Sequence, residues 1–78
     1  MVKIYTKYNC VQCKMSKTLM DKLGIDYEVV NTEDEPEYVG RLKESGFKQL
    51  PVIEYNHELL FSGFNPSKIK ELVKTATN

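Results

Sequence analysis

Residues 2–13 read Val-Lys-Ile-Tyr-Thr-Lys-Tyr-Asn-Cys-Val-Gln-Cys, and this stretch decides the fold. The apolar run at its start predicts a short strand over residues 2–6. If a helix begins near Cys10, the sulfurs of Cys10 and Cys13 lie on one face of its first turn. A disulfide between them would close a loop of four residues, which stabilises a fold by only about 2 kcal/mol. The pair is therefore a poor structural staple, and it favours reversible thiol–disulfide exchange.

The helix that carries this pair has recognisable ends. Asn9 is a favourable N-cap, and Gln12 three residues later resembles a capping box. Apolar residues at a spacing of four predict a stripe that faces the core, formed by Val11, Met15, Leu19 and Leu23. Gly24 is suited to end the helix.

A second strand and a second helix follow. Residues 25–30 alternate between apolar and polar side chains, which predicts a strand. The acidic run 33–37 contains Pro36, and both features are typical of a helix start. The helix is expected to reach about Ser45 and to be closed by Gly46, with three residues facing inward, namely Tyr38, Val39 and Leu42.

The last part of the chain predicts a hairpin and a final helix. Strands over residues 50–55 and 58–61 are joined by Asn56-His57, a two-residue connection that suits a hairpin turn. Residues 62–64 predict a turn, and Asn65-Pro66 predicts a cap and first residue of a helix. Its inward face is expected to comprise Ile69, Leu72, Val73 and Ala76. The element order is then β-α-β-α-β-β-α, with the first two strands parallel.

Composition narrows the possible classes of function. The chain has 78 residues, which predicts a single domain over 1–78, and it carries 11 basic and 11 acidic side chains. It has no basic block, so we expect no nucleic-acid partner. No stretch approaches the ~18 apolar residues of a membrane span, and the N-terminal residues lack a signal-peptide pattern, so we expect no membrane partner. We expect a cytoplasmic monomer, in a compartment where disulfides are usually transient and catalytic.

The two thiols are predicted to have different roles. Cys10 would lie in the first helical turn, where free backbone N–H groups favour a thiolate, and Lys7 and Lys14 are near in sequence. Cys13 lies one turn further in. We therefore expect Cys10 to attack a substrate disulfide and Cys13 to resolve the mixed disulfide.

Two other interpretations of the cysteines stay open. In the first interpretation, the two cysteines are simply small buried apolar residues, since cysteine is among the most buried residue types. In the second interpretation, the two cysteines are ligands of a metal ion or an iron–sulfur cluster. Zinc takes four ligands, and the chain adds only His57, at the expected hairpin tip, so two chains or exogenous thiols would have to contribute.

Two downstream segments are further candidates for the site. Pro51 opens a strand without a ladder donor, which would leave the backbone of Leu50 free to pair with a substrate strand. An ordinary trans proline is the alternative. Ser62-Gly63-Phe64 combines a flexible glycine with an aromatic residue that would either contact a partner or pack in the core.

Together these residues resemble the thioredoxin superfamily and, within it, the NrdH-redoxins. The resemblance rests on residues 4–6 leading into Cys-Val-Gln-Cys, on Gly-Phe-Lys-Gln-Leu-Pro-Val at 46–52, and on Ser62-Gly63-Phe64 with Pro66 beyond. It implies a thioredoxin-like α/β fold, a four-stranded mixed sheet flanked by three helices, and a cis bond before Pro51. It also implies a partner-binding surface formed by Val11, Gln12, Leu50, Pro51, Ser62, Gly63 and Phe64.

The resemblance also implies a partner set. NrdH-redoxins receive electrons from NADPH through thioredoxin reductase and reduce class Ib ribonucleotide reductase, with no bound cofactor beyond the redox-active disulfide. A glutathione-dependent glutaredoxin is the alternative. Glutaredoxins commonly have a Gly-Gly-x-x-Asp segment that binds glutathione, whereas this chain has Ser62-Gly63-Phe64-Asn65-Pro66. The chain also departs from many NrdH-redoxins, which have Trp at position 61 and Arg at position 65 where it has Phe61 and Asn65.

Overall fold

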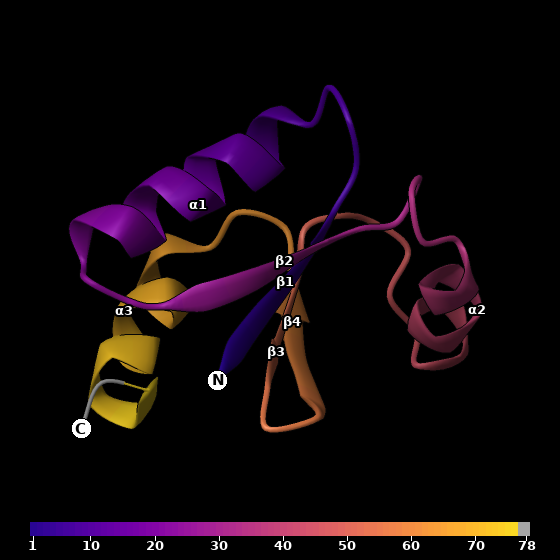
Figure 1. Cartoon of the computed structure of the whole chain (residues 1–78). Coiled ribbons are helices and arrows are strands. Elements are labelled where there is room, and N and C mark those ends of the chain that lie inside the picture. Colours follow the sequence, from indigo (N-terminus) through magenta and orange to yellow (C-terminus); the bar gives the residue numbers. More distant parts are fainter. Residues whose placement is uncertain (77–78) are drawn as a thin grey trace.

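The computed structural model describes residues 1–76, and the side chains of residues 1–75. Its elements follow the predicted order (Figure 1). They are β1 (Val2–Thr6), α1 (Val11–Lys22), β2 (Tyr27–Asn31), α2 (Glu37–Glu44), β3 (Val52–Tyr55), β4 (Glu58–Ser62) and α3 (Pro66–Ala76). The predicted fold class, a four-stranded mixed sheet with three helices, is confirmed.

The sheet has the strand order β2-β1-β3-β4. β1 pairs in parallel with β2 and antiparallel with β3, with Tyr5 opposite Val52 in the central pair. β3 and β4 form the predicted hairpin, and its turn residues Asn56 and His57 have φ values of 49° and 70°. A two-residue turn in which both central residues have positive φ has a backbone twist that matches the twist of the flanking strands.

Helices cover the sheet on both faces. Figure 1 shows α1 and α3 together on one side of the strands and α2 on the other. The cluster under α1 and α3 comprises Val2, Ile4, Met20, Ile25, Ile53, Phe61, Ile69 and Leu72. The cluster under α2 comprises Tyr5, Val30, Leu42 and Val52. Alternate residues of β1 therefore serve different cores, as the pleat of a strand requires.

The start of α1 differs from the prediction. Cys10, and not Asn9, is the N-cap: its Sγ accepts a hydrogen bond from the Cys13 N–H at 3.2 Å. Asn9 has a φ of 56°, a left-handed conformation that asparagine tolerates but that differs from the extended backbone of an N-cap. The Gln12 side chain does not close a capping box, because its oxygen accepts from Phe64 N–H instead.

The predicted apolar stripe of α1 is wrong in its first half. Val11 is 72% exposed and Met15 43%, whereas the buried positions of the helix are Cys13, Ser16 and Met20. The reason is helix geometry. A spacing of four drifts around the helix by about 40° per step, so a stripe that faces the core at Leu23 has turned away from it by Val11.

The other boundaries shift by a few residues. The second strand is Tyr27–Asn31 and not 25–30, although Ile25 is buried in the core before it. β3 begins at Val52, after the cis Leu50–Pro51 bond, and Ser62 is the last residue of β4. Asn65 caps α3 as predicted, through a 3.1 Å bond from Lys68 N–H to its Oδ1. The side chain of Ala76, predicted to face inward, lies outside the described residues.

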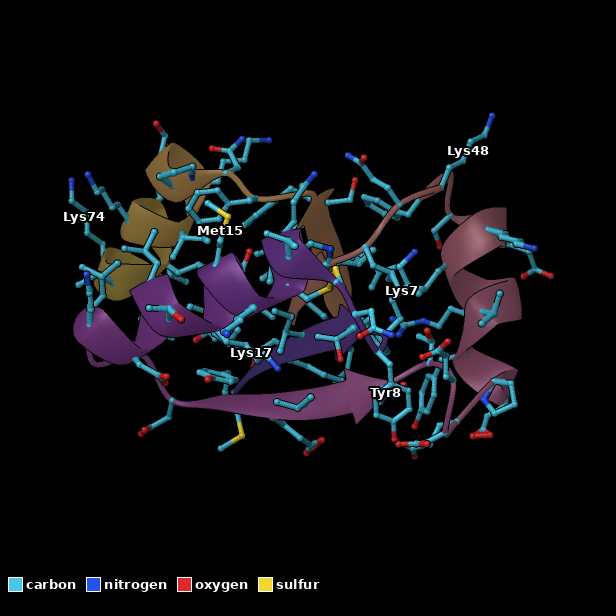
Figure 2. All side chains as sticks on the ribbon, turned by 90° about the horizontal axis from the view of Figure 1, so that it is seen from above. Lys7, Tyr8, Met15, Lys17, Lys48 and Lys74 are labelled. Carbon is cyan, nitrogen blue, oxygen red and sulfur yellow. A yellow bond between two sulfur atoms is a disulfide. The ribbon has the colours of Figure 1, made fainter. Side chains whose placement is uncertain are left out.

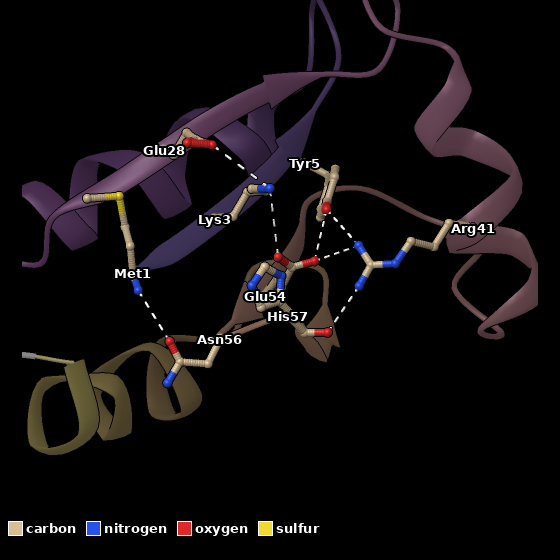
Figure 3. Close-up of polar contacts among 8 residues, drawn as sticks. All are labelled: Met1, Lys3, Tyr5, Glu28, Arg41, Glu54, Asn56 and His57. Atoms are coloured by element: carbon tan, nitrogen blue, oxygen red, sulfur yellow. Dashed lines mark hydrogen bonds and ion pairs between the residues drawn. The ribbon is translucent and has the colours of Figure 1, made fainter.

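A buried charge joins α2 to the centre of the sheet (Figure 3). Glu54 of β3 is 3% exposed, and its Oε1 accepts from Arg41 Nη1 at 2.6 Å and from the Tyr5 hydroxyl at 2.9 Å. Arg41 also donates to the carbonyl oxygen of His57 in the hairpin turn at 3.1 Å. Lys3, next to Glu54 in the register, places its Nζ 3.9 Å from Glu54 Oε2.

This environment changes the ionisation of two groups. Burial alone would raise the pKa of Glu54, but the hydrogen bonds from Arg41 and Tyr5 outweigh it and hold that pKa below its usual range. Burial, together with the bond to Glu54, raises the pKa of Tyr5 to about 12. The network therefore contains an ionised carboxylate, a neutral phenol and a cation at neutral pH.

We expect Arg41→Ala to lower the free energy of unfolding by about 1–2 kcal/mol at pH 7, because it removes the hydrogen-bonded cation of the buried Glu54 carboxylate and leaves only Lys3, at 3.9 Å. The lowered pKa of Glu54 means that its contribution exists above the usual glutamate pKa and is lost as pH falls through the folded-state value. The deficit of the variant should therefore narrow on acidification. Urea unfolding across that pH range measures it. Lys43→Ala, on the same exposed helix, is the control, and an equal loss for both variants would contradict the assignment.

Candidate active site

The predicted cysteine pair is joined in a disulfide at the N-terminal end of α1 (Figure 2). The two Cα atoms are 5.2 Å apart. Cys10 is partly exposed, whereas Cys13 is 2% exposed and faces the sheet. Only Cys10 can therefore meet a sulfur atom of another protein without movement of the helix.

Backbone geometry favours negative charge on Cys10. The N–H of Cys13 points at Cys10 Sγ, at the end of the helix where N–H groups have no partner within the helix. A hydrogen bond of this kind is stronger to a thiolate than to a neutral sulfur. Thiol–disulfide exchange proceeds through a thiolate, and this N–H lies where it would stabilise one on Cys10.

The start of β3 lies against the outer sulfur. Cys10 Sγ is 4.0 Å from the carbonyl oxygen of Leu50. The Leu50–Pro51 bond is cis, as the resemblance implied. Pro51 itself is buried, and Leu50 is partly exposed beside the disulfide.

The turn after β4 completes the site. Gly63 N–H donates to the carbonyl oxygen of Pro51 at 2.8 Å, and Phe64 N–H donates to Gln12 Oε1 at 2.9 Å. Gln12 thus ties the cysteine segment to this turn, and Gly63 ties the turn to the proline segment. The three segments that the sequence singled out form one continuous surface.

The predicted partner-binding residues differ in exposure on this surface. Val11 and Gln12 are exposed, and Leu50, Ser62 and Phe64 are partly exposed. Pro51 and Gly63 are buried, so any contact that they make with a partner would be through the backbone. Their role in binding stays a prediction.

Sequence reasoning missed the part played by Tyr8. Its N–H donates to Glu33 Oε2 at 2.7 Å, and its hydroxyl donates to Asp34 Oδ2 at 2.7 Å. The bond to Asp34 raises the pKa of Tyr8. The acidic run, predicted as a helix start, therefore also holds the loop that precedes Cys10. No local pattern signals these contacts, since they join residues about 25 positions apart.

A groove of about 510 Å³ adjoins Leu50 on the side of α2. Its wall is apolar and includes Val39, Leu42, Phe47, Leu50 and Val52. Three cations, Lys7, Lys43 and Lys48, lie around it, and Figure 2 shows Lys7 and Lys48 on this side of the disulfide. The groove suits an apolar side chain with a neighbouring negative charge.

Other kinds of site find less support in the residues described. Within residues 1–76, no three or more His, Cys, Asp and Glu side chains are grouped so that they could hold a metal ion. His57 is at the tip of the hairpin, where its backbone carbonyl binds Arg41. No helix in the same range is long and apolar enough to cross a membrane.

We expect Gly63→Ala to destabilise the oxidised protein by about 1–2 kcal/mol. Gly63 has a φ of +80°, and a Cβ there would lie 2.9 Å from Gln49 Nε2 and 3.4 Å from Gln12 Oε1. Gly40→Ala is the matched control, because a Cβ at this position of α2 meets nothing within 4 Å, and alanine should stabilise the helix by about 1 kcal/mol. Urea unfolding distinguishes the two, and shifts of the same sign would count against a tight turn at Gly63.

Comparison with known proteins agrees with this geometry. A family model described as glutaredoxin matches residues 2–60. The glutaredoxin-like protein NrdH of Lactococcus lactis subsp. lactis is 40% identical over 72 residues, which are 92% of this chain and 99% of that protein. The NrdH protein of Escherichia coli strain K12 is 41% identical over 71 residues, covering 91% of this chain and 86% of that protein.

Solved structures agree as well. The glutaredoxin-like NrdH-redoxin from Escherichia coli, described as having a thioredoxin-like activity profile, superposes with a TM-score of 0.85 at 39% identity, covering 91% of this chain and 92% of that one. A buckwheat glutaredoxin–glutathione complex shares the fold, with a TM-score of 0.78 at 19% identity over 97% of this chain and 76% of that one. The chain belongs to the glutaredoxin family and, within it, to the NrdH redoxins, which makes it a thiol–disulfide oxidoreductase with a redox-active disulfide.

Proposed function

We propose that this protein reduces disulfides in other proteins, with Cys10 as nucleophile and Cys13 as resolving thiol. The Cys10 thiolate attacks one sulfur of the substrate disulfide, and the other substrate sulfur leaves as a thiolate. The Cys13 thiolate then attacks Cys10 Sγ, which releases the second substrate sulfur and forms the Cys10–Cys13 disulfide. Two electrons pass to the substrate, and a reductase returns them.

The difference in exposure between the two sulfurs carries this proposal. Cys13 is 2% exposed and cannot approach a bulky substrate, whereas Cys10 is partly exposed and lies at the end of a helix. Cys13 lies three residues after Cys10, on the first turn of the same helix, so the second attack is intramolecular and has a high effective concentration.

The surroundings of Cys10 favour a peptide as substrate. The backbone of Leu50 lies beside the sulfur and precedes the first paired residue of β3, so it is placed to pair with an extended segment. Val11 and Phe64 offer apolar contact next to it. The groove at Leu50, with its three lysines, would take a side chain of that segment.

We further propose that thioredoxin reductase, with NADPH, is the reductant, that class Ib ribonucleotide reductase is the electron acceptor, and that the protein works in the cytoplasm. The relatives at about 40% identity are NrdH proteins, and the one from Escherichia coli is described as having a thioredoxin-like activity profile. The sequence also lacks the Gly-Gly-x-x-Asp segment that glutaredoxins commonly use for glutathione.

A glutathione-dependent glutaredoxin is the second candidate, because the family model that matches is that of glutaredoxins. The turn after β4 argues against it. Phe64 N–H already donates to Gln12 Oε1, so a carboxylate of glutathione would have to displace that bond. A site with this donor already satisfied favours a protein surface over a small anionic peptide.

We expect the oxidised protein to be reduced rapidly by thioredoxin reductase and NADPH, and only slowly by glutathione with glutathione reductase. NADPH consumption, followed by absorbance with a disulfide-bonded protein substrate as acceptor, compares the two systems. A class Ib ribonucleotide reductase as final acceptor should sustain the consumption beyond one equivalent.

The control for this comparison is the variant in which both cysteines are serine, which should consume no NADPH in either system. Rapid reduction by glutathione, with no reduction by the reductase, would establish the glutaredoxin alternative.

We expect Cys13→Ser to accumulate a mixed disulfide with a substrate protein, because the second attack is removed. Cys10→Ser should accumulate none, since its remaining thiol is buried. Non-reducing electrophoresis and mass spectrometry after incubation with the oxidised substrate detect the adduct. An adduct that forms on Cys10→Ser instead would reverse the two roles.

A further inference from the structure

Ser16 is a buried polar residue that the fold does not use. Its exposed fraction is 0%, and Ser16 Oγ has no hydrogen-bond partner among the residues that the structure describes. A buried hydroxyl without a partner is unfavourable, and native structures keep few of them. Each such group in a native structure calls for an explanation, and a redox role is one of the possible ones.

Helix geometry places this hydroxyl next to the resolving cysteine. Cys13, Ser16 and Met20 form the buried face of α1. Residues three apart lie one above the other on a helix, and helical side chains lean toward the N-terminus. Ser16 therefore lies one turn after Cys13 on the same buried face of α1, although no hydrogen bond joins the two side chains in the disulfide form.

The surroundings offer the hydroxyl little else. The cluster on this face of the sheet is apolar. Glu54, the buried charged residue of the described chain, lies on the opposite face under α2, bound to Arg41 and Tyr5. On α1 itself, Lys14 is exposed and Lys17 is partly exposed, so neither belongs to the buried face. Thr6 is the other buried hydroxyl that alternation along β1 directs toward α1.

We propose that Ser16 is a positioning residue for Cys13 in the reduced protein, where its hydroxyl donates a hydrogen bond to the Cys13 thiolate. In the disulfide, Cys13 Sγ is uncharged and a weak acceptor. When the disulfide takes up two electrons, the S–S bond breaks and Cys13 becomes a thiol or thiolate, which is a much stronger acceptor. The hydroxyl then gains its partner and increases the fraction of Cys13 present as the attacking thiolate.

The proposed role predicts which redox state the hydroxyl favours, whereas a purely structural role predicts no preference. The hydroxyl stabilises the reduced state but is left unpaired in the oxidised state. Ser16→Ala removes a benefit from the reduced protein and an unpaired group from the oxidised protein. The variant should therefore favour the disulfide, and its reduction potential should become more negative.

The test measures the dithiol–disulfide equilibrium against dithiothreitol for the wild type and Ser16→Ala. We expect the equilibrium to shift about threefold to tenfold toward the disulfide, where tenfold corresponds to about 30 mV. In the Cys10→Ser background, ultraviolet titration of the remaining thiolate should show a higher pKa for Cys13 when Ser16 is replaced by alanine.

Three further variants make the test specific. Ser16→Thr keeps a hydroxyl and should keep both values near the wild type, whereas Thr18→Ala removes an exposed hydroxyl of the same helix and should change neither. Ser16→Gly also removes the hydroxyl, and it should shift the equilibrium in the same direction as alanine although it weakens the helix in both states.

Unchanged equilibrium and titration in Ser16→Ala would overturn the proposal. So would a shift produced by Thr6→Val and not by Ser16→Ala, which would assign the role to β1. The effect of Ser16 on turnover rests on the proposed order of attack. The equilibrium and titration involve no reductase and no substrate protein, so they test Ser16 even if those partners are wrong.

Discussion

Antiparallel pairing places Tyr5 of β1 opposite Val52 of β3 at the centre of the sheet. The end of β1 and the beginning of β3 therefore lie at the same edge, and the loop that leads to Cys10 emerges beside Leu50. A slip of one residue would turn every side chain of the strand to the other face. It would move Val52 from the cluster under α2 to the face under α1 and α3, and it would remove Glu54 from Arg41. The register is thus fixed by burial on both faces, and the position of the active site follows from it.

The two faces of the sheet then serve different purposes. On one face, the apolar core under α1 holds the helix whose first turn carries the cysteines, so that Cys13 is buried and Cys10 is not. On the other face, the Glu54–Arg41 ion pair ties α2 to β3 and to the hairpin turn. The groove beside Leu50 is formed between α2 and the start of β3, so this ion pair supports one wall of the proposed peptide site.

Local patterns predicted the order of elements, the hairpin turn and the cysteine pair, because each depends on residues close in sequence. They did not predict contacts between distant segments. The local pattern predicts a capping box for Gln12, but its side-chain oxygen accepts a hydrogen bond from the Phe64 N–H, 52 residues away. Glu54 carries a charge, which predicts an exposed side chain in its strand. Its burial is explained only by the hydrogen bond from Arg41, a residue of another element. The stripe from Val11 was misjudged because burial of Cys13 sets which face of the helix points inward.

A redox protein must fold in two covalent states, with and without its disulfide. The arrangement at Cys10 allows this with little change in the rest of the structure. The disulfide closes only four residues, so its reduction frees little of the chain. The Cys10 sulfur caps α1 in the oxidised form, and a thiolate at the same place would accept the Cys13 N–H more strongly. The helix start is therefore satisfied in both states. Among the residues that the structure describes, no backbone N–H donates to Cys13 Sγ in its buried position. The unpaired hydroxyl of Ser16 on the same face of α1 is the group that we propose to stabilise this second sulfur, as the helix end stabilises the first.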